Sequence, residues 1–416
     1  MTPSGVAPQA VRLLPGAESF VVDELLAYTP CGSGEHLYVQ VEKRDLATDR
    51  VADALAQCCG CARRAVGFAG RKDRSAVARQ WFSVLGAREE ALRELEAQTG
   101  GRARPLEVTR HRNKIRLGHL LGNRFRLTLQ ASDPEPTRAR LEAELARIGE
   151  QGFPHRFGAQ RFGRGGSTLR VAIALGEGRP WDAVRWQLDP AGRWQPGDPL
   201  PAGASRGFEG RMRASLRRSP QDPQAALCAA GRDFAQLAAS AAQSAVFNAV
   251  LEARSAAGLL YRVRAGDVVR KIGGGPFVCS SEDLDDVNRR AAPGCLEVVA
   301  TGPLPGTAKL VPSEAVRAEE REWSRETGVA WEWFERGGSL ESPGERRPLW
   351  VRPLDPPRCT VGSSSTLVLE VGLPRGTYAT ELLSELGVTL PANRSRPEAR
   401  LPDGSEERAS AILGSA

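Results

Sequence analysis

GFAGRKDRSAVARQWFSV, residues 67–84, is a glycine-punctuated turn that carries a single carboxylate, Asp73, and runs into an apolar segment. The residues just before the turn, 65–68, are few and β-prone, and the apolar segment after it is β-prone again. Gly67 and Gly70 permit backbone angles that are closed to other residues. The pattern therefore predicts a strand, a loop and a strand, with Asp73 held on the loop between two sheet elements.

The charges around Asp73 leave two interpretations open. Four cations lie close to it in the sequence: Arg71, Lys72, Arg74 and Arg79. Nearby positive charge keeps a carboxylate ionised, so Asp73 would be an anion available as a nucleophile or a base. An aspartate in a glycine-rich turn is more commonly a turn former or a helix cap, however. On chemistry alone the structural interpretation is the more common one.

Length and charge limit the classes of protein to consider. The chain has 416 residues, of which 41% are hydrophobic, so it is long enough for two or three domains. Its 57 basic and 50 acidic residues give a net charge of +7, which favours a polyanionic partner without requiring one. Residues 102–126 carry a dense group of cations with only Glu107 opposing them. This segment suits phosphate contact and a solvated face equally well.

Cysteine and hydropathy patterns argue against metal and membrane. The eight cysteines lack the repeated, closely spaced pairs of a structural zinc site, and residues 58–61 form their only cluster. This pattern favours reduced, partly buried thiols over a metal site. The N-terminus has no basic segment followed by an apolar core, and no run approaches the roughly 18 apolar residues of a membrane span. We expect a soluble, cytoplasmic protein with no metal and no membrane partner.

Hydrophobic periodicity predicts the main elements. Strands are expected at 20–24, 36–42, 125–129 and 366–371, where apolar residues alternate or cluster. Helices are expected after Thr48, at 89–98, around 141–148, at 225–254 and after Thr377. Both threonines are predicted N-caps. Residues 1–8 should be loose.

Composition also predicts how the domains are arranged. After about residue 181 prolines accumulate, and the chain becomes helical and then loop-rich. We therefore expect a first domain whose first part is 1–180, an inserted domain at 181–342, and a return to the first domain at 343–390. Residues 391–416 are polar and rich in Pro, Ser and Glu, so a disordered tail is expected.

The ordered motif Gly67-x-x-Gly70-x-Lys72-Asp73-x-x-Ala76-Val77-x-x-Gln80-Trp81 resembles the signature of the TruD family of tRNA pseudouridine synthases. In that family the nucleophilic aspartate occupies the place of Asp73. Segments 20–39, 110–125, 152–163 and 373–386 also resemble the family. The resemblance implies an α+β pseudouridine synthase fold: a mixed, mostly antiparallel sheet flanked by helices and interrupted by a smaller inserted α/β domain.

The resemblance also implies which residues bind the substrate. Phe20 would lie beside the target nucleotide, Phe157 would stack on a flipped uracil, and the turn of Gly376 and Tyr378 would face the substrate. Lys72 is placed with them as a neighbour of Asp73.

Three positions depart from the family. His155 and Arg156 replace an expected asparagine and tyrosine, although histidine can still donate one hydrogen bond to a base edge. The family's aspartate is held by a lysine three residues before an N-terminal proline. Arg12, before Pro15, has that spacing, and it keeps the charge but not the compact shape of lysine.

The reaction implied by the resemblance breaks the bond from ribose to N1 of uracil, turns the base and rejoins it through C5. It involves no redox change and no outside group, so no cofactor is expected. The expected partner is tRNA, with uridine-13 of the D arm as the usual target. A noncatalytic RNA-binding or RNA-folding protein on the same scaffold is an alternative motivated by His155 and Arg156, and a synthase for another RNA is a second. The residues leave open whether Asp73 attacks the base or the ribose.

Overall fold

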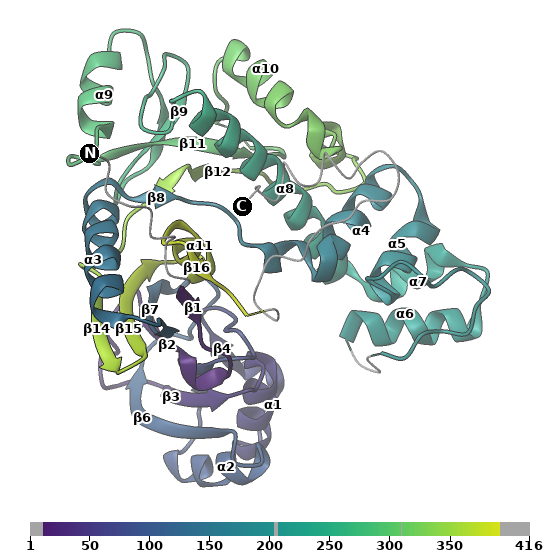
Figure 1. The fold of residues 1–416 in the computed structure, drawn as a ribbon. Helices are drawn as coiled ribbons and strands as arrows, with labels where there is room; N and C mark the ends of the chain where they lie inside the picture. Colours follow the sequence, from purple (N-terminus) through teal and green to yellow (C-terminus); the bar gives the residue numbers. More distant parts are fainter. Residues whose placement is uncertain (1–10, 204–206, 309, 392–416) are drawn as a thin grey trace. The chain divides into compact units, whose positions relative to one another are not determined.

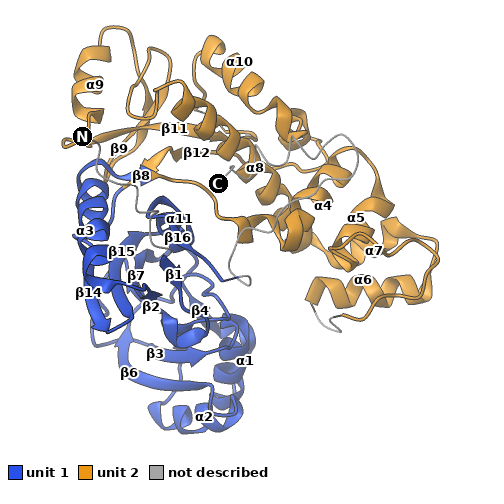
Figure 2. Cartoon of the chain, in the orientation of Figure 1, with its two compact units in different colours: residues 1–153, 352–391 blue, residues 154–351, 392–416 orange. Residues whose placement is uncertain are grey.

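The computed structural model describes residues 11–203, 207–308 and 310–391. The expectations for residues 1–8 and for the tail beyond 391 lie outside this range. The described chain divides into two compact units: unit 1 combines residues 11–153 with 352–391, and unit 2 covers residues 154–351 (Figure 2). The predicted insert, 181–342, falls within unit 2. The compact units are defined by contacts within the chain and do not test where an inserted domain begins and ends. The domain boundaries therefore stay a prediction.

Unit 1 is built on one large mixed sheet (Figure 1). Its strands are β1 (Val11–Leu13), β2 (Phe20–Leu26), β3 (His36–Arg44), β4 (Val66–Phe68), β5 (Val77–Leu85), β6 (Ala103–His111), β7 (Leu120–Gln130), β14 (Arg358–Ser363), β15 (Thr366–Pro374) and β16 (Val388–Thr389). The main order is β14-β15-β7-β2-β5-β3-β6, with β1 beside β7 and β16 and with β4 beside β5. Within the described residues of this sheet, the parallel pairs are β2 with β5 and β1 with β16. The mixed, mostly antiparallel sheet is therefore confirmed.

The helices of unit 1 are α1 (Thr48–Cys58), α2 (Leu95–Gln98), α3 (Pro134–Gln151) and α11 (Ala379–Glu385). α1 is amphipathic, and its buried Val51 and Leu55 join a core with Leu37, Val39 and Val41 of β3. α3 packs against β14 and β15. Residues 89–98 are helical as predicted, but 89–94 form a 3-10 helix and the α-helical part is a single turn.

Both predicted threonine caps are wrong. α1 begins at Thr48 itself, with Ala47 at the N-cap position and no capping side chain. α11 begins only at Ala379, with Tyr378 at the N-cap. Thr377 still belongs to the preceding turn, in which its N–H donates to the Pro374 carbonyl at 3.2 Å.

The role predicted for the two signature glycines also needs correction. Neither Gly67 nor Gly70 adopts a positive φ. Gly67 is instead required by close packing, because a Cβ there would lie 2.2 Å from the main-chain oxygen of Ile115. At Gly70 the nearest atom to such a Cβ is 3.9 Å away, which is ordinary contact.

Unit 2 combines helices with a four-stranded antiparallel sheet ordered β10-β9-β11-β12. The helices are α4 (Ser167–Gly176), α5 (Pro180–Leu188), α6 (Gly207–Arg218), α7 (Pro223–Ala230), α8 (Arg232–Ala256), α9 (Leu284–Ala291) and α10 (Glu314–Trp323). The strands are β9 (Val268–Lys271), β10 (Pro276–Val278), β11 (Val298–Leu304) and β12 (Glu345–Pro348), while β8 (Phe153–Pro154) and β13 (Trp350–Val351) lie where the chain passes between units.

The helix predicted at 225–254 is two helices, α7 and α8, separated at Gly231, whose φ of 87° breaks the helix. By length and composition alone, α8 could cross a membrane. However, 67% of its most apolar window is buried inside unit 2, as is typical of the core helix of a globular domain.

Candidate active site

Asp73 lies on the loop between β4 and β5, so the predicted strand, loop and strand are confirmed. β5 runs through the sheet, pairing with β2 in parallel and with β3 in antiparallel register. Asp73 is exposed, and its Oδ1 accepts a hydrogen bond from the Ser75 N–H at 3.0 Å. This short bond orients the carboxylate on a loop that emerges from the sheet.

Buried side chains hold the backbone of this loop. The Lys72 N–H donates to Thr48 Oγ1 at 2.9 Å, and the Thr48 hydroxyl donates to Gln80 Oε1 at 3.0 Å. The amide nitrogen of Gln80 donates in turn to the Gly70 carbonyl. Thr48 and Gln80 are 2% and 0% exposed, so water does not compete for these bonds. The Thr48 hydroxyl thus serves the loop, which explains why it does not cap α1.

Lys72 points into the sheet. Its ammonium forms an ion pair with Glu24 of β2, and both side chains are almost completely buried. Glu24 Oε1 also accepts from the Trp81 N–H at 3.2 Å. Burial raises the pKa of the Glu24 carboxyl, and the attraction of Lys72 opposes that rise. The predicted substrate-binding role of Lys72 stays a prediction, and the pair fixes the loop to β2.

A further cation, Lys43 of β3, was missed by the sequence reasoning. Its Nζ donates to the main-chain oxygen of Asp73 at 2.7 Å, and the residue is only 1% exposed. Burial lowers the pKa of the Lys43 ammonium to about 8, with Asp73 acting in the opposite direction. The available signal was a lysine at a position where the alternation of the strand, after Leu37, Val39 and Val41, requires a core residue.

The other predicted residues of unit 1 occupy varied surroundings. Arg12 lies on β1, where its Nε donates to Gln130 Oε1 at 2.9 Å. Phe20 begins β2 and is 5% exposed, with its ring edge-to-face against Phe125 at 5.8 Å. The roles proposed for both from the resemblance stay predictions.

Hydrogen bonds connect the predicted turn at Gly376 to the Asp73 loop. Gly376 has a φ of 80°, which favours glycine. The adjacent Arg375 donates from Nη1 to the Gly118 carbonyl at 3.1 Å, and the Gly118 N–H donates to the Ala69 carbonyl at 2.9 Å. These bonds connect the Arg375 side chain, through Gly118, to Ala69 at the start of the Asp73 loop, and the substrate-facing role of Gly376 and Tyr378 stays a prediction.

Gly118 belongs to the basic segment, which forms the loop between β6 and β7. The Ile115 N–H donates to Ser83 Oγ at 2.9 Å, and the Tyr38 hydroxyl donates to the Asn113 carbonyl at 2.7 Å. Exposed arginines lie on the Asp73 loop and on the two segments linked to it through Gly118: Arg71, Arg74, Arg112, Arg116 and Arg375, of which Arg71 is paired with Asp49. Such a group of guanidinium ions is suited to a phosphate backbone.

Phe157, in unit 2, is 7% exposed. The guanidinium carbon of Arg347 lies 3.9 Å from its ring centroid, and Phe247 packs edge-to-face against it at 5.5 Å. Its N–H donates to Asn248 Oδ1 at 2.9 Å. A base that stacks on this ring would have to share it with the Arg347 guanidinium. The stacking role of Phe157 stays a prediction.

His155 and Arg156, the two departures from the family pattern, have partners within unit 2. His155 Nδ1 lies 3.2 Å from the Pro348 carbonyl, which can only accept, so Nδ1 carries the proton. The predicted hydrogen bond from His155 to a base edge stays a prediction. Arg156 forms an ion pair with Glu252 of α8.

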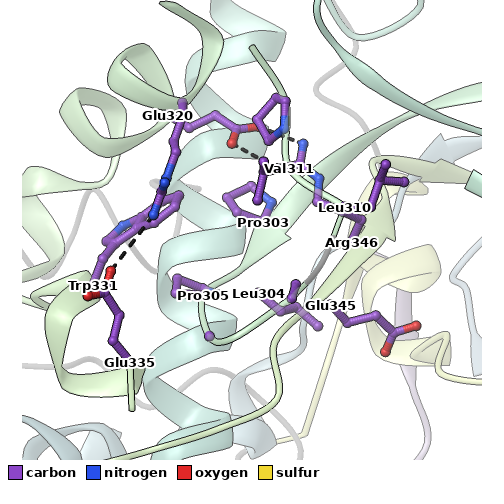
Figure 3. Close-up of a pocket in the computed structure, with 14 residues that line it drawn as sticks. Pro303, Leu304, Pro305, Leu310, Val311, Glu320, Trp331, Glu335, Glu345 and Arg346 are labelled. Carbon is purple, nitrogen blue, oxygen red and sulfur yellow. Dashed lines mark hydrogen bonds and ion pairs between the residues drawn. The ribbon is translucent and has the colours of Figure 1, made fainter. Parts of the chain in front are cut away.

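Two cavities are lined by none of the predicted site residues. In unit 2 a cavity of about 40 Å³ is lined by Trp331 and the buried ion pair of Glu320 and Arg346 (Figure 3), and it is too small for a nucleobase. In unit 1 an open groove of about 750 Å³ lies between α3 and residues 352–360.

Comparison with known proteins gives one family. The family model described as tRNA pseudouridine synthase D (TruD) matches residues 8–190 and 202–386. The chain is 36% identical to tRNA pseudouridine synthase D of Geobacter metallireducens over 89% of this chain and 93% of that protein. It is 34% identical to the protein of the same name from Anaeromyxobacter sp. (strain Fw109-5), over 94% and 98%. A crystal structure of a candidate TruD from Methanosarcina mazei matches with a TM-score of 0.64 and 25% identity, over 91% of this chain and 94% of that one.

Proposed function

The chain belongs to the TruD family of tRNA pseudouridine synthases and converts a uridine of tRNA to pseudouridine, and on this premise we propose that Asp73 is the nucleophile and uridine-13 of the D arm the target. The observation that carries the proposal is the contrast at the loop. Its backbone is held by the buried side chains of Thr48, Gln80 and Lys43, while the Asp73 side chain is exposed. A nucleophile needs this combination of a fixed position and an accessible carboxylate.

The reaction requires a positioned carboxylate and a way to hold the target uridine outside its stack. The bond from ribose to N1 breaks, the base turns, and a bond from ribose to C5 replaces it, while C5 loses a proton and N1 gains one. A carboxylate that forms a temporary covalent bond divides this exchange into easier steps. The target uridine must first leave its stack, at a cost of a few kcal/mol. We propose that the exposed arginines of the Asp73 loop and of the segment bonded to it, such as Arg74 and Arg116, offset part of this cost by binding phosphates near the uridine.

We also propose, from the resemblance, that Phe20, Tyr378, Phe157 and His155 contact the substrate. The chain would act in the cytoplasm, where tRNA is available.

The test is Asp73→Asn, which keeps the shape of the side chain and removes its charge. We expect pseudouridine formation on unmodified tRNA transcripts to fall to background, while tRNA binding changes by less than about threefold, because a binding contact contributes little relative to a covalent step. Carbodiimide labelling with primer extension reads the modified position. Asp53→Asn on α1 removes another exposed carboxylate, outside the loop, and should retain full activity.

Each outcome discriminates between the alternatives. Activity retained in Asp73→Asn excludes Asp73 as the nucleophile. RNA from cells lacking the protein is the substrate for mapping the target. If the wild-type protein modifies this RNA at a position other than 13, that position replaces uridine-13 as the proposed target. Binding without modification by the wild type favours the noncatalytic RNA-binding alternative.

A further inference from the structure

Lys43 occupies a core position of the sheet. On β3 it follows Leu37, Val39 and Val41 on the face that packs against α1. Its register partners are Ala78 on β5 and Ala103 on β6. Paired residues share a face, so two small side chains flank the long lysine and leave room for it to extend along the sheet.

The ammonium at the end of this side chain contacts the main chain of the Asp73 loop. Its Nζ donates to the Asp73 carbonyl at 2.7 Å. The charged groups that act on it are Asp73 and Lys72 of the loop and Asp45 of the turn after β3. Burying an ammonium costs free energy unless the group is hydrogen-bonded. This one is hydrogen-bonded to the main chain of the proposed nucleophile.

The choice of lysine is informative in this chain. Of its 57 basic residues, 52 are arginine and five are lysine, at positions 43, 72, 114, 271 and 309. Two of these five, Lys43 and Lys72, are the buried cations that hold the Asp73 loop. An ammonium is a compact point charge on a flexible stem, whereas a guanidinium is a planar group with five donors.

We propose that Lys43 is a positioning residue for the isomerisation: its ammonium holds the Asp73 main chain, so that the carboxylate is presented in one orientation. This inference rests on the proposed role of Asp73 and adds the cation that supports it. Lys43 acts through the backbone of Asp73 and is not itself a catalytic residue.

The proposal has a pH signature. Burial and Lys72 favour the neutral amine and Asp73 favours the ammonium, with the balance at a pKa of about 8. Above that pH the amine still donates a hydrogen bond but has lost its charge, and charge-assisted bonds are the stronger ones. The turnover number should therefore fall as pH rises through about 8.

The experiment measures kcat and KM on a tRNA transcript from pH 6 to 9.5 for the wild type, Lys43→Met, Lys43→Arg and the control Lys271→Met. Lys43→Met should lower kcat by about 10- to 100-fold with KM changed by less than about threefold, because a charged hydrogen bond is removed while the exposed arginines remain. Lys43→Arg keeps a cation that does not titrate in this range, so it should regain part of the activity and lose the decline near pH 8. Lys271, exposed on β9, serves as the matched loss of one ammonium and should leave both parameters unchanged.

Several results would overturn the inference. One is wild-type kcat with Lys43→Met, and another is a decline near pH 8 that persists in Lys43→Arg. If neither variant folds, a wild-type kcat that stays level through pH 8 suffices to reject it. Asp73→Asn, assayed beside them, separates the two proposals: inactive Asp73→Asn with fully active Lys43→Met rejects only the role of Lys43, whereas active Asp73→Asn rejects the role of Asp73.

Discussion

Asp73 and Lys72 are adjacent in the sequence, yet one is exposed and the other is buried. Lys72 turns inward because Glu24, on a strand that pairs with β5, offers its carboxylate inside the sheet. The exposed member could be predicted, since a glycine-rich loop with several cations indicates a presented side chain. The buried pair could not, because it depends on which strands become neighbours.

We expect Lys72→Met to destabilise the protein strongly at neutral pH. Removal of one partner leaves the Glu24 carboxylate buried without a cation, which costs about 3–5 kcal/mol in the free energy of unfolding. Denaturant titration measures the loss. The double variant Glu24→Gln with Lys72→Met removes both charges and should recover much of the stability.

The same variant should show a defined pH dependence. The pKa of Glu24 is already raised in the folded protein, and loss of Lys72 removes the largest opposing effect. A carboxyl whose folded pKa lies above its unfolded value stabilises the fold below the unfolded pKa, and this contribution is lost as pH rises through the folded pKa. Lys72→Met should therefore be least destabilised near pH 4 and progressively more so toward pH 8. A destabilisation independent of pH would show that Glu24 is not responsible.

Among the elements, the strands were more predictable than the connections between them. Alternation identifies β2, β7 and β15, in which buried and more exposed positions alternate over much of the strand. The same pattern identifies β3, although Tyr38 and Glu42 on its other face are buried as well. The local rule for a helix cap failed at Thr48, since its hydroxyl is used by a loop that lies 24 residues away in the sequence. Helix caps are predictable only where no tertiary partner competes for the same side chain.

The signature glycines provide a test at this scale. Gly67→Ala places a Cβ 2.2 Å from the Ile115 carbonyl oxygen, so β4 and the basic segment would have to separate. We expect a loss of roughly 2–4 kcal/mol in the free energy of unfolding. Gly70→Ala, with nothing closer than 3.9 Å, is the matched control and should change stability by less than about 1 kcal/mol. Equal effects of the two would show that the close approach does not limit the fold.

At the scale of the whole molecule, the sequence predicted an α+β fold with a mixed sheet, and the structure and its relatives confirm it. Periodicity supplied the main elements and the resemblance supplied the fold class. The division of the chain at residues 153 and 352 could not be predicted from the sequence, because Pro154 and Arg352 lie in no obvious linker. Contacts between distant segments define a compact unit, and a single sequence does not record them.

The net charge of +7 leads to a final prediction, which concerns how the affinity of the entire chain for tRNA depends on salt. Affinity for tRNA should fall linearly on a logarithmic scale of salt concentration, since bound phosphates release counterions. The double variant Arg112→Ala with Arg116→Ala should lower that slope by about one unit for each phosphate that the variant no longer binds. Arg217→Ala with Arg218→Ala removes the same charge from exposed positions on α6. Filter binding at several salt concentrations compares the two pairs. If only the first pair changes the slope, the basic segment binds phosphates directly; equal changes would mean that the overall charge, and not this segment, attracts the RNA.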